Sequence, residues 1–154
     1  MRIRRAAIAD FERLKSIKLM SKKEEAMYSH TLKPIESIKD RYFSYLKRDL
    51  TIGNRAVFIA EENKEVVGMV LGKYFKPLSI SRFDKKGHIS NLYVVEGHRK
   101  SGIGEKLVLR AMEWLRQNDV RHIGLEVHVE NRAACKFYKK LGFREYTIKL
   151  IKEQ

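Results

Sequence analysis

The alternation of apolar and polar residues predicts the order of helices and strands in the first half of the chain. Residues 1–6 are typical of a short strand. Segments 8–20 and 34–50 carry apolar side chains at helical spacing, and Asp10 stands where the first helix would take its N-cap. Segment 55–75 holds two apolar runs around the polar turn "EENKE", which predicts a β-hairpin.

The second half alternates strands and helices more regularly. The expected elements are a strand at about 88–95, a helix that begins near Gly102, a strand at 121–131, a helix at 131–143 that Gly142 ends, and a last strand at 144–154. This order predicts an α/β fold in which helices cover a mixed sheet. No repeat or boundary interrupts the pattern, so residues 1–154 are expected to form a single domain.

Composition supports a globular protein in a reducing compartment. Hydrophobic residues make up 44% and charged residues 34% of the chain, as in a soluble domain with a charged surface. The single cysteine, Cys135, excludes an internal disulfide framework. The first residues lack the apolar core of a signal peptide, and the longest apolar run, Ala56 to Ala60, is too short to cross a bilayer. We therefore expect a cytoplasmic protein with no membrane partner.

The formal net charge of +14 is the strongest bias in the composition. Such a charge suits a nucleic acid, an anionic membrane surface or a polyanionic small ligand. The basic residues mostly come in pairs, such as Lys22-Lys23 and Lys139-Lys140, and acidic residues lie between them. That interleaving favours a solvated surface over a dedicated nucleic-acid face.

The stretch "HRKSGIGEKL", residues 98–107, places Gly102 and Gly104 between a predicted strand and a predicted helix. The free N–H groups of a first helical turn point outward, and the helix dipole favours an anion there. The spacing does not match a Walker loop, and a dinucleotide fingerprint would need a glycine at Leu107. The stretch predicts an anion site; the alternative is a turn that the glycines merely shape.

Two motifs resemble those of one enzyme family. The pattern [QR]-x-x-G-x-[GA] after a strand is matched by Arg99 to Gly104, and N-x-x-A-x-x-x-Y-x-x-x-G-F is matched by Asn131 to Phe143. Over about residues 88–146 the chain therefore resembles the GNAT superfamily of acetyl-CoA-dependent N-acetyltransferases. The resemblance implies a mixed, mostly antiparallel central sheet flanked by helices.

The same resemblance implies acetyl-CoA as the co-substrate and no metal. Loop amides from Lys100 to Glu105 would cradle the pyrophosphate of coenzyme A, and the preceding strand would pair its backbone with the pantetheine arm. The expected cofactor-binding residues are Leu92, Tyr93, Val94, Arg99, Lys100, Ser101, Gly102, Ile103, Gly104, Glu105 and Asn131. A polyanionic ligand also suits the basic residues that flank the loop.

Tyr138 is the expected general acid. By resemblance, this tyrosine protonates the coenzyme A thiolate or hydrogen-bonds its sulfur; the alternative is a tyrosine that only packs beside Phe137 and Leu141. Asn131 lies two helical turns before Tyr138, where it would cap its helix and, by resemblance, also lie near the pantetheine arm. Cys135 has no activating neighbour in the sequence and is expected to be a packed thiol, not a nucleophile.

The general base is less directly indicated. Many GNAT enzymes use a glutamate on the strand before the glycine loop, but "HISNLYVV" contains none. Glu126 matches a glutamate of the N-terminal protein acetyltransferases, and an apolar strand around it would raise its pKa toward the range of a base. An exposed strand position or a buried salt bridge are the alternatives for Glu126. His88, His128 or an ordered water chain are further candidates for the base.

These features predict an N-acetyltransferase that moves the acetyl group directly, in a ternary complex, to a primary amine. The amine belongs to a protein or peptide N-terminus, a lysine or a small molecule. Residues 20–50, which include His30, and loop 74–87 would shape the acceptor side, and the positive charge favours an acceptor that carries acidic groups. The alternative is a coenzyme A-binding regulatory protein that docks on nucleic acid or the ribosome through its basic surface. A homodimer through pairing of the last strand is a further option.

Overall fold

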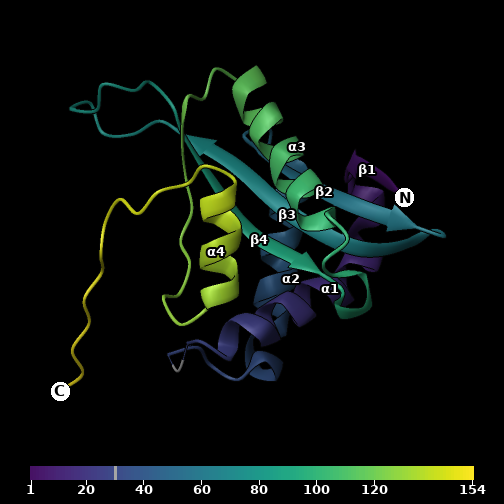
Figure 1. Ribbon diagram of the computed structural model, residues 1–154. Helices are drawn as coiled ribbons and strands as arrows, with labels where there is room; N and C mark the ends of the chain where they lie inside the picture. The colour runs from purple at the N-terminus through teal and green to yellow at the C-terminus, as the bar shows by residue number, and fades with distance from the viewer. Residues whose placement is uncertain (30) are drawn as a thin grey trace.

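The computed structural model describes residues 1–29 and 31–154 and is built on one five-stranded sheet (Figure 1). The strands are β1 (Arg2–Arg5), β2 (Arg55–Glu62), β3 (Glu65–Phe75), β4 (Lys86–Val94) and β5 (His122–Gly124), in that spatial order. The helices are α1 (Phe11–Ala26), α2 (Ile35–Thr51), α3 (Ile103–Gln117) and α4 (Arg132–Lys140), and short 3₁₀ turns span Ile8–Asp10 and Glu96–His98. Neighbouring strands are antiparallel, except that β4 and β5 are parallel.

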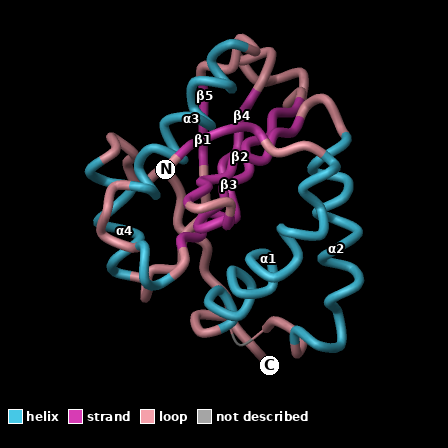
Figure 2. The backbone as a smooth tube through the Cα atoms, turned by 90° about the vertical axis from the view of Figure 1, so that its right-hand side faces the viewer, coloured by secondary structure: helices cyan, strands magenta, loops and turns pink. Residues whose placement is uncertain are grey.

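The helices cover the sheet on both sides, with α1 and α2 on one face and α3 and α4 on the other (Figure 2). Each face has its own apolar core, because side chains alternate between the two faces along β2 and β3. Phe58 and Val70 point toward α3, while Val57 and Leu71 point toward α1 and α2. The predicted α/β class, with a mostly antiparallel sheet flanked by helices, is confirmed.

The hairpin predicted from residues 55–75 is confirmed as β2 and β3. Its turn is Asn63-Lys64, and both residues have positive φ, 50° and 67°, as a two-residue hairpin turn requires. A register shift between Ala60 and Glu61 interrupts the ladder. Beyond that shift, Arg55 lies opposite Lys73.

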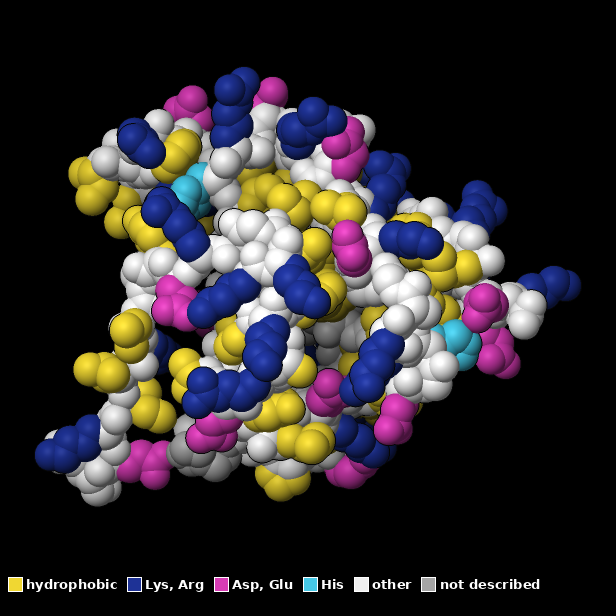
Figure 3. Space-filling model, in the orientation of Figure 1, with side chains coloured by type: hydrophobic (Ala, Val, Ile, Leu, Met, Phe, Trp, Pro, Cys, Tyr) yellow, Lys and Arg dark blue, Asp and Glu magenta, His cyan; other side chains and the backbone are white. Residues whose placement is uncertain are grey.

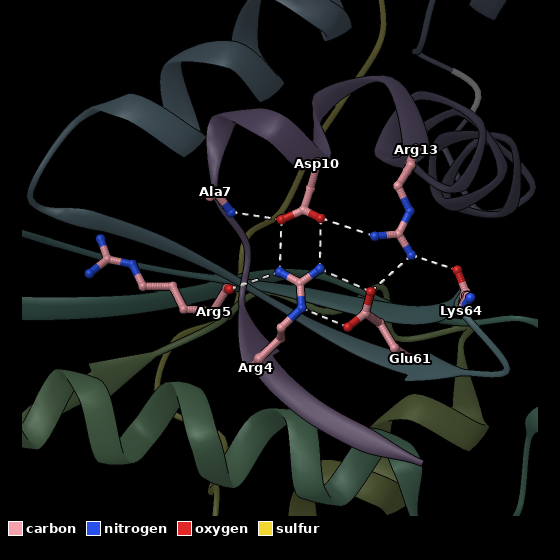
Figure 4. A network of polar contacts seen from close by, with 7 residues as sticks. All are labelled: Arg4, Arg5, Ala7, Asp10, Arg13, Glu61 and Lys64. Atoms are coloured by element: carbon pink, nitrogen blue, oxygen red, sulfur yellow. Dashed lines mark hydrogen bonds and ion pairs between the residues drawn. The ribbon is translucent and has the colours of Figure 1, made fainter.

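Asp10 is not the side-chain cap of α1 that the sequence predicted. Its carboxylate accepts hydrogen bonds from the Arg4 guanidinium, 2.7 and 2.8 Å away, and from the N–H of Ala7, 2.8 Å away. The same guanidinium donates to Glu61 on β2, and Arg13 donates to both carboxylates (Figure 4). Two charged acceptors hold this network together more strongly than a single cap hydrogen bond would, and it ties the start of the chain to the hairpin.

Two predicted strands differ from the structure. The strand expected at 121–131 ends at Gly124, and the strand expected at 144–154 does not form. Tyr146, Ile148 and Leu150 alternate as in a strand but are 77%, 82% and 89% exposed, and the segment leaves the body of the protein (Figure 1). The alternation gives strand propensity, but a strand also needs a neighbouring strand in a backbone ladder, and no described strand forms a ladder with this segment.

No helix within the described part of the chain is long and apolar enough to cross a membrane.

Candidate functional site

The sheet opens into a fork between β4 and β5. Only Lys86 to His88 pair with β5, so the β5-facing edge of β4 has no strand partner among the described residues from Ile89 onward. The register between β3 and β4 shifts in the same region, where Asn91 has a positive φ of 53°. An unpaired strand edge presents N–H and C=O groups to any extended ligand. The edge includes the residues expected to bind pantetheine, Leu92, Tyr93 and Val94.

A helix N-terminus lies at the far end of this edge. After β4 the chain makes a short turn and enters α3 through Gly102, whose φ of 80° is in the left-handed region. The first intrahelical bond runs from the N–H of Lys106 to the carbonyl of Gly102, so the N–H groups of Ile103, Gly104 and Glu105 have no partner within the helix. This arrangement fits a pyrophosphate, because the unpaired amides and the helix dipole both favour an anion.

The polar side chains of the loop are placed less uniformly. The hydroxyl of Ser101 donates to the carbonyl of His98 at 2.5 Å, and Lys100 is exposed with a φ of 61°. Arg99 turns away from the loop: its guanidinium pairs with Glu24 of α1 and donates to the carbonyl of Val94 at 2.9 Å. An added Cβ at Gly104 would lie 3.6 Å from the ring of Phe137, an ordinary contact, so the folded chain does not itself require a glycine there.

Tyr138 projects from α4 into the apolar core between α3, α4 and the sheet. Its ring centroid lies 5.1 Å from that of Phe137 and 5.9 Å from that of Phe143. Burial raises the pKa of the phenol to about 12. The structure records no hydrogen bond from its hydroxyl to any described residue, so the group is available to a ligand. Asn131 caps α4 as predicted, because its Oδ1 accepts from the N–H of Ala134 at 3.1 Å.

Two of the candidate bases lie close together. His88 is half-buried, and burial lowers its pKa; the charge of Lys73 lowers it further, while the charge of Glu126 opposes both effects. Glu126 is exposed and lies two residues beyond the end of β5, not within an apolar strand as expected. His128 is exposed as well, and it stacks on Tyr28 with centroids 6.5 Å apart. His30, expected on the same side, lies outside the described residues.

The acid and base candidates approach the fork from opposite faces of the sheet. Tyr138 packs on the core beneath α3, together with Leu125. The neighbouring Glu126 interacts electrostatically with His88 and Lys73, which belong to the face covered by α1 and α2. A reacting carbonyl in the fork would therefore have a base on one side and a proton donor on the other, as transfer between two ligands requires.

No sequence pattern predicted the polar row that lies on the face beneath α1 and α2. Arg55 of β2, Lys73 of β3 and His88 of β4 lie opposite one another in adjacent strands. Asp49 of α2 pairs with Arg55 at 2.9 Å. One indication was present in the sequence: along each strand, positions 55 and 73 alternate in step with the residues that face that core. Whether the two side chains meet depends on the strand register, which no local pattern predicts.

Comparisons with known proteins agree with this geometry. Residues 22–143 match the sequence profile of the family described as "Acetyltransferase (GNAT) family". The N-alpha-acetyltransferase of Sulfurisphaera tokodaii is 36% identical over 98 residues, which cover 60% of this chain and 59% of that protein. The N-alpha-acetyltransferase of Sulfolobus acidocaldarius is 35% identical over 103 residues, covering 64% of this chain and 60% of that protein. The matches thus span about six tenths of these relatives.

A solved structure shares the fold over the whole chain. The predicted acetyltransferase of Clostridium acetobutylicum, determined with acetyl-CoA, superposes with a TM-score of 0.79. The comparison covers 99% of this chain and 95% of that one, at 23% identity. The likeness extends to the N-terminal helices, whereas the two sequence motifs supported the resemblance only over about residues 88–146.

Proposed function

Because the chain belongs to the acetyltransferase (GNAT) family, we propose that it transfers the acetyl group of acetyl-CoA to a primary amine in a ternary complex. The observation that carries the proposal is the open edge of β4, which leads to the unpaired amides at the start of α3. An extended ligand with a pyrophosphate at one end matches both parts. Acetyl-CoA supplies the reactive thioester; the residues of the chain bind, orient and exchange protons.

The loop before α3 and the open edge of β4 would bind different parts of acetyl-CoA. The N–H groups of Ile103, Gly104 and Glu105 would bind the pyrophosphate, with Lys100 adding positive charge at the rim. The backbone of Leu92 to Val94 would hydrogen-bond the amide groups of the pantetheine arm, as a neighbouring strand would. Arg99 would contribute only after releasing Glu24, so we assign it a secondary role.

Tyr138 would stabilise the leaving sulfur. The amine nitrogen attacks the thioester carbonyl carbon, a C–N bond forms, the C–S bond breaks and the sulfur leaves with the bonding electron pair. A phenol with a pKa of about 12 stays neutral at every working pH, so it is always able to donate a hydrogen bond to that sulfur. The assignment is supported by the hydroxyl of Tyr138, which makes no hydrogen bond to any described residue.

Glu126, beside His88, would accept the proton that the amine loses. The demand on this base depends on the acceptor, because an α-amine has a reference pKa of about 7.7–8.0 and a lysine amine about 10.4. An exposed carboxylate or a half-buried imidazole suits the less basic α-amine better than the lysine amine. We therefore propose an α-amine, that of a polypeptide N-terminus, as the acceptor. The relatives from Sulfurisphaera tokodaii and Sulfolobus acidocaldarius are both named N-alpha-acetyltransferase, which points the same way.

The test is acetyl-CoA turnover, followed by thiol release, against peptides, polyamines, amino acids and aminoglycosides. Release with peptides, and its loss when the peptide N-terminus is blocked, would support the proposal. Tight acetyl-CoA binding without release from any amine would refute transfer and favour the regulatory alternative. That alternative needs a basic docking surface, and Figure 3 shows Lys and Arg mixed with acidic side chains over the visible face. The cytoplasmic location and the homodimer stay predictions.

A further inference from the structure

A row of basic side chains crosses the sheet and ends at the fork. On the face beneath α1 and α2, Arg55 lies opposite Lys73, and Lys73 lies opposite His88. His88 in turn lies opposite Gly124, the last residue of β5. Side chains directly opposite in adjacent strands have Cβ atoms about 4.5–5.5 Å apart, so these three groups are immediate neighbours.

Positive charge exceeds negative charge around this row. Asp49 is 4% exposed and is the buried carboxylate of the cluster. Arg55 lies 2.9 Å and Arg48 3.9 Å from its Oδ1. Lys18, 3% exposed, and Lys73 also interact electrostatically with Asp49. Four cations thus lie around one buried carboxylate, and the exposed Glu126 is a further negative group that acts on Lys73. Burial together with the nearby cations Lys22 and Arg48 lowers the pKa of Lys18 to about 8.

Two donors of the row lack an acceptor. The Nε of Arg55 is buried and makes no hydrogen bond within the described part of the chain. The ammonium of Lys73 is half-buried, and residues 1–29 and 31–154 provide it with no hydrogen bond or ion pair. Buried donors without acceptors are costly, and so is an excess of buried positive charge. One added carboxylate would correct both.

We propose that Lys73 and Arg55 bind a carboxylate of the amine acceptor. This inference rests on the proposed transfer reaction, which places the acceptor amine beside His88 and Glu126. Adjacent strands lie about 4.8 Å apart, so a carboxylate over Lys73 or Arg55 lies roughly 5–10 Å from His88. An extended peptide advances about 3.3 Å per residue, and an acidic side chain reaches further beyond the backbone, so that carboxylate belongs to the first or second residue of the acceptor.

The chemistry admits two sources of this carboxylate. One is a polypeptide N-terminus with Asp or Glu at its first or second position; the other is a free amino acid, whose own α-carboxylate lies close to its amine. Both place an anion no further than roughly 10 Å from the amine. A peptide pair and an amino-acid pair therefore form the two arms of the test.

The peptide arm compares a short peptide that begins Ala-Asp with one that begins Ala-Asn. We expect kcat/KM to be about tenfold to a hundredfold higher for the acidic peptide, the range expected for a hydrogen-bonded ion pair. Lys73→Met should bring the two values within about twofold of each other, and Lys73→Arg, which keeps the positive charge beside His88, should keep most of the preference. Lys149→Met removes a charge from an exposed residue of the C-terminal segment, away from the candidate site, and serves as the matched control. Thermal unfolding of each variant would detect loss of the fold.

The amino-acid arm compares free aspartate and alanine with the Ala-Asp peptide. Rapid turnover of both amino acids would assign the carboxylate to a small-molecule acceptor, and turnover of the peptide alone would assign it to a polypeptide. Equal kcat/KM for the Ala-Asp and Ala-Asn peptides would overturn the proposal. So would a preference that survives Lys73→Met, or one that Lys149→Met removes equally.

A binding measurement separates this inference from the transfer reaction. Calorimetric titration of the two peptides into the protein saturated with coenzyme A needs no turnover. Tighter binding of the acidic peptide, lost in Lys73→Met, would support the carboxylate site even if no amine were acetylated. Equal binding of both peptides would refute the site even if both were acetylated.

Discussion

Replacing Tyr138 by Phe removes one hydroxyl from the candidate site and leaves its surroundings in place. The ring keeps its contacts with Phe137 and Phe143. No described residue loses a hydrogen bond, so the free energy of unfolding should change by less than about 0.5 kcal/mol. Any loss of activity then reports on the hydroxyl itself.

The raised pKa of Tyr138 decides how large that loss should be. Full transfer of its proton to a thiolate with a pKa near 8.5 would run uphill by about 3.5 units, or roughly 5 kcal/mol, from a phenol with a pKa of about 12. The favourable contribution is therefore a hydrogen bond to a charged sulfur, worth about 1.5–3 kcal/mol. We expect kcat to fall about tenfold to a hundredfold in Tyr138→Phe.

The assay is steady-state thiol release at saturating acceptor, with the KM for acetyl-CoA measured in parallel. The KM should change little, because the hydrogen bond strengthens as negative charge develops on the sulfur. Tyr146→Phe, at a residue that is 77% exposed, is the matched control and should have no effect. A kcat within twofold of the wild type would refute the role of Tyr138. A fall beyond about 10⁴-fold would indicate proton transfer instead of a hydrogen bond.

Three further changes test other parts of the structure. Gly102→Ala places a Cβ on a backbone with φ of 80°, at a cost of about 1–2 kcal/mol. The midpoint of urea denaturation should therefore fall to a lower concentration, and acetyl-CoA should bind more weakly. An unchanged midpoint would contradict this expectation. The hydrogen bond from Arg4 lowers the pKa of Asp10 from 3.8 to about 2, so its stabilisation, about 2 kcal/mol, is present above pH 3.8 and is lost as the pH falls toward 2. Asp10→Asn should therefore unfold more easily at pH 7 and match the wild type near pH 2, and coincident curves at pH 7 would exclude that contribution. Glu126→Gln should lower kcat/KM about a hundredfold or more. A loss below tenfold would assign the role of base to His88 instead. Protonation of His88 should then make the activity fall below pH 6.5, and this fall should be absent in His88→Gln.

Local sequence patterns predicted the structure correctly where a short stretch contains both partners of its hydrogen bonds. The hairpin turn at Asn63-Lys64 joins two runs that hydrogen-bond each other. The cap at Asn131 bonds an N–H three residues away, and Gly142, with a φ of 86°, lies just past the end of α4 as predicted. The start of α3 at Gly102 belongs to the same class, because the strand, the glycine and the helix that form it follow one another in the chain.

Patterns failed where a distant partner decides the outcome. Asp10 has the composition of an N-cap, but Arg4 and Arg13 offer its carboxylate charged donors from the strand before it and the helix after it. Residues 144–154 have the alternation of a strand, yet a strand exists only when a neighbour supplies the ladder. Propensity describes what a segment can do, and tertiary contacts select among the options.

The carboxylate site illustrates a harder case, because a single bulge creates it. Continued from the pair of Glu62 and Glu65, an ideal two-residue hairpin would set Arg55 opposite Gly72, on the face beneath α3. The shift at Ala60 and Glu61 moves the ladder by one residue and sets Arg55 opposite Lys73 instead. Since a one-residue shift exchanges the faces of a strand, it brings the two cations together on the side where Glu126 and His88 lie. Neither the motifs nor the net charge of +14 contains that information, and only the three-dimensional register brings the scattered basic residues into the row that we propose binds the acceptor.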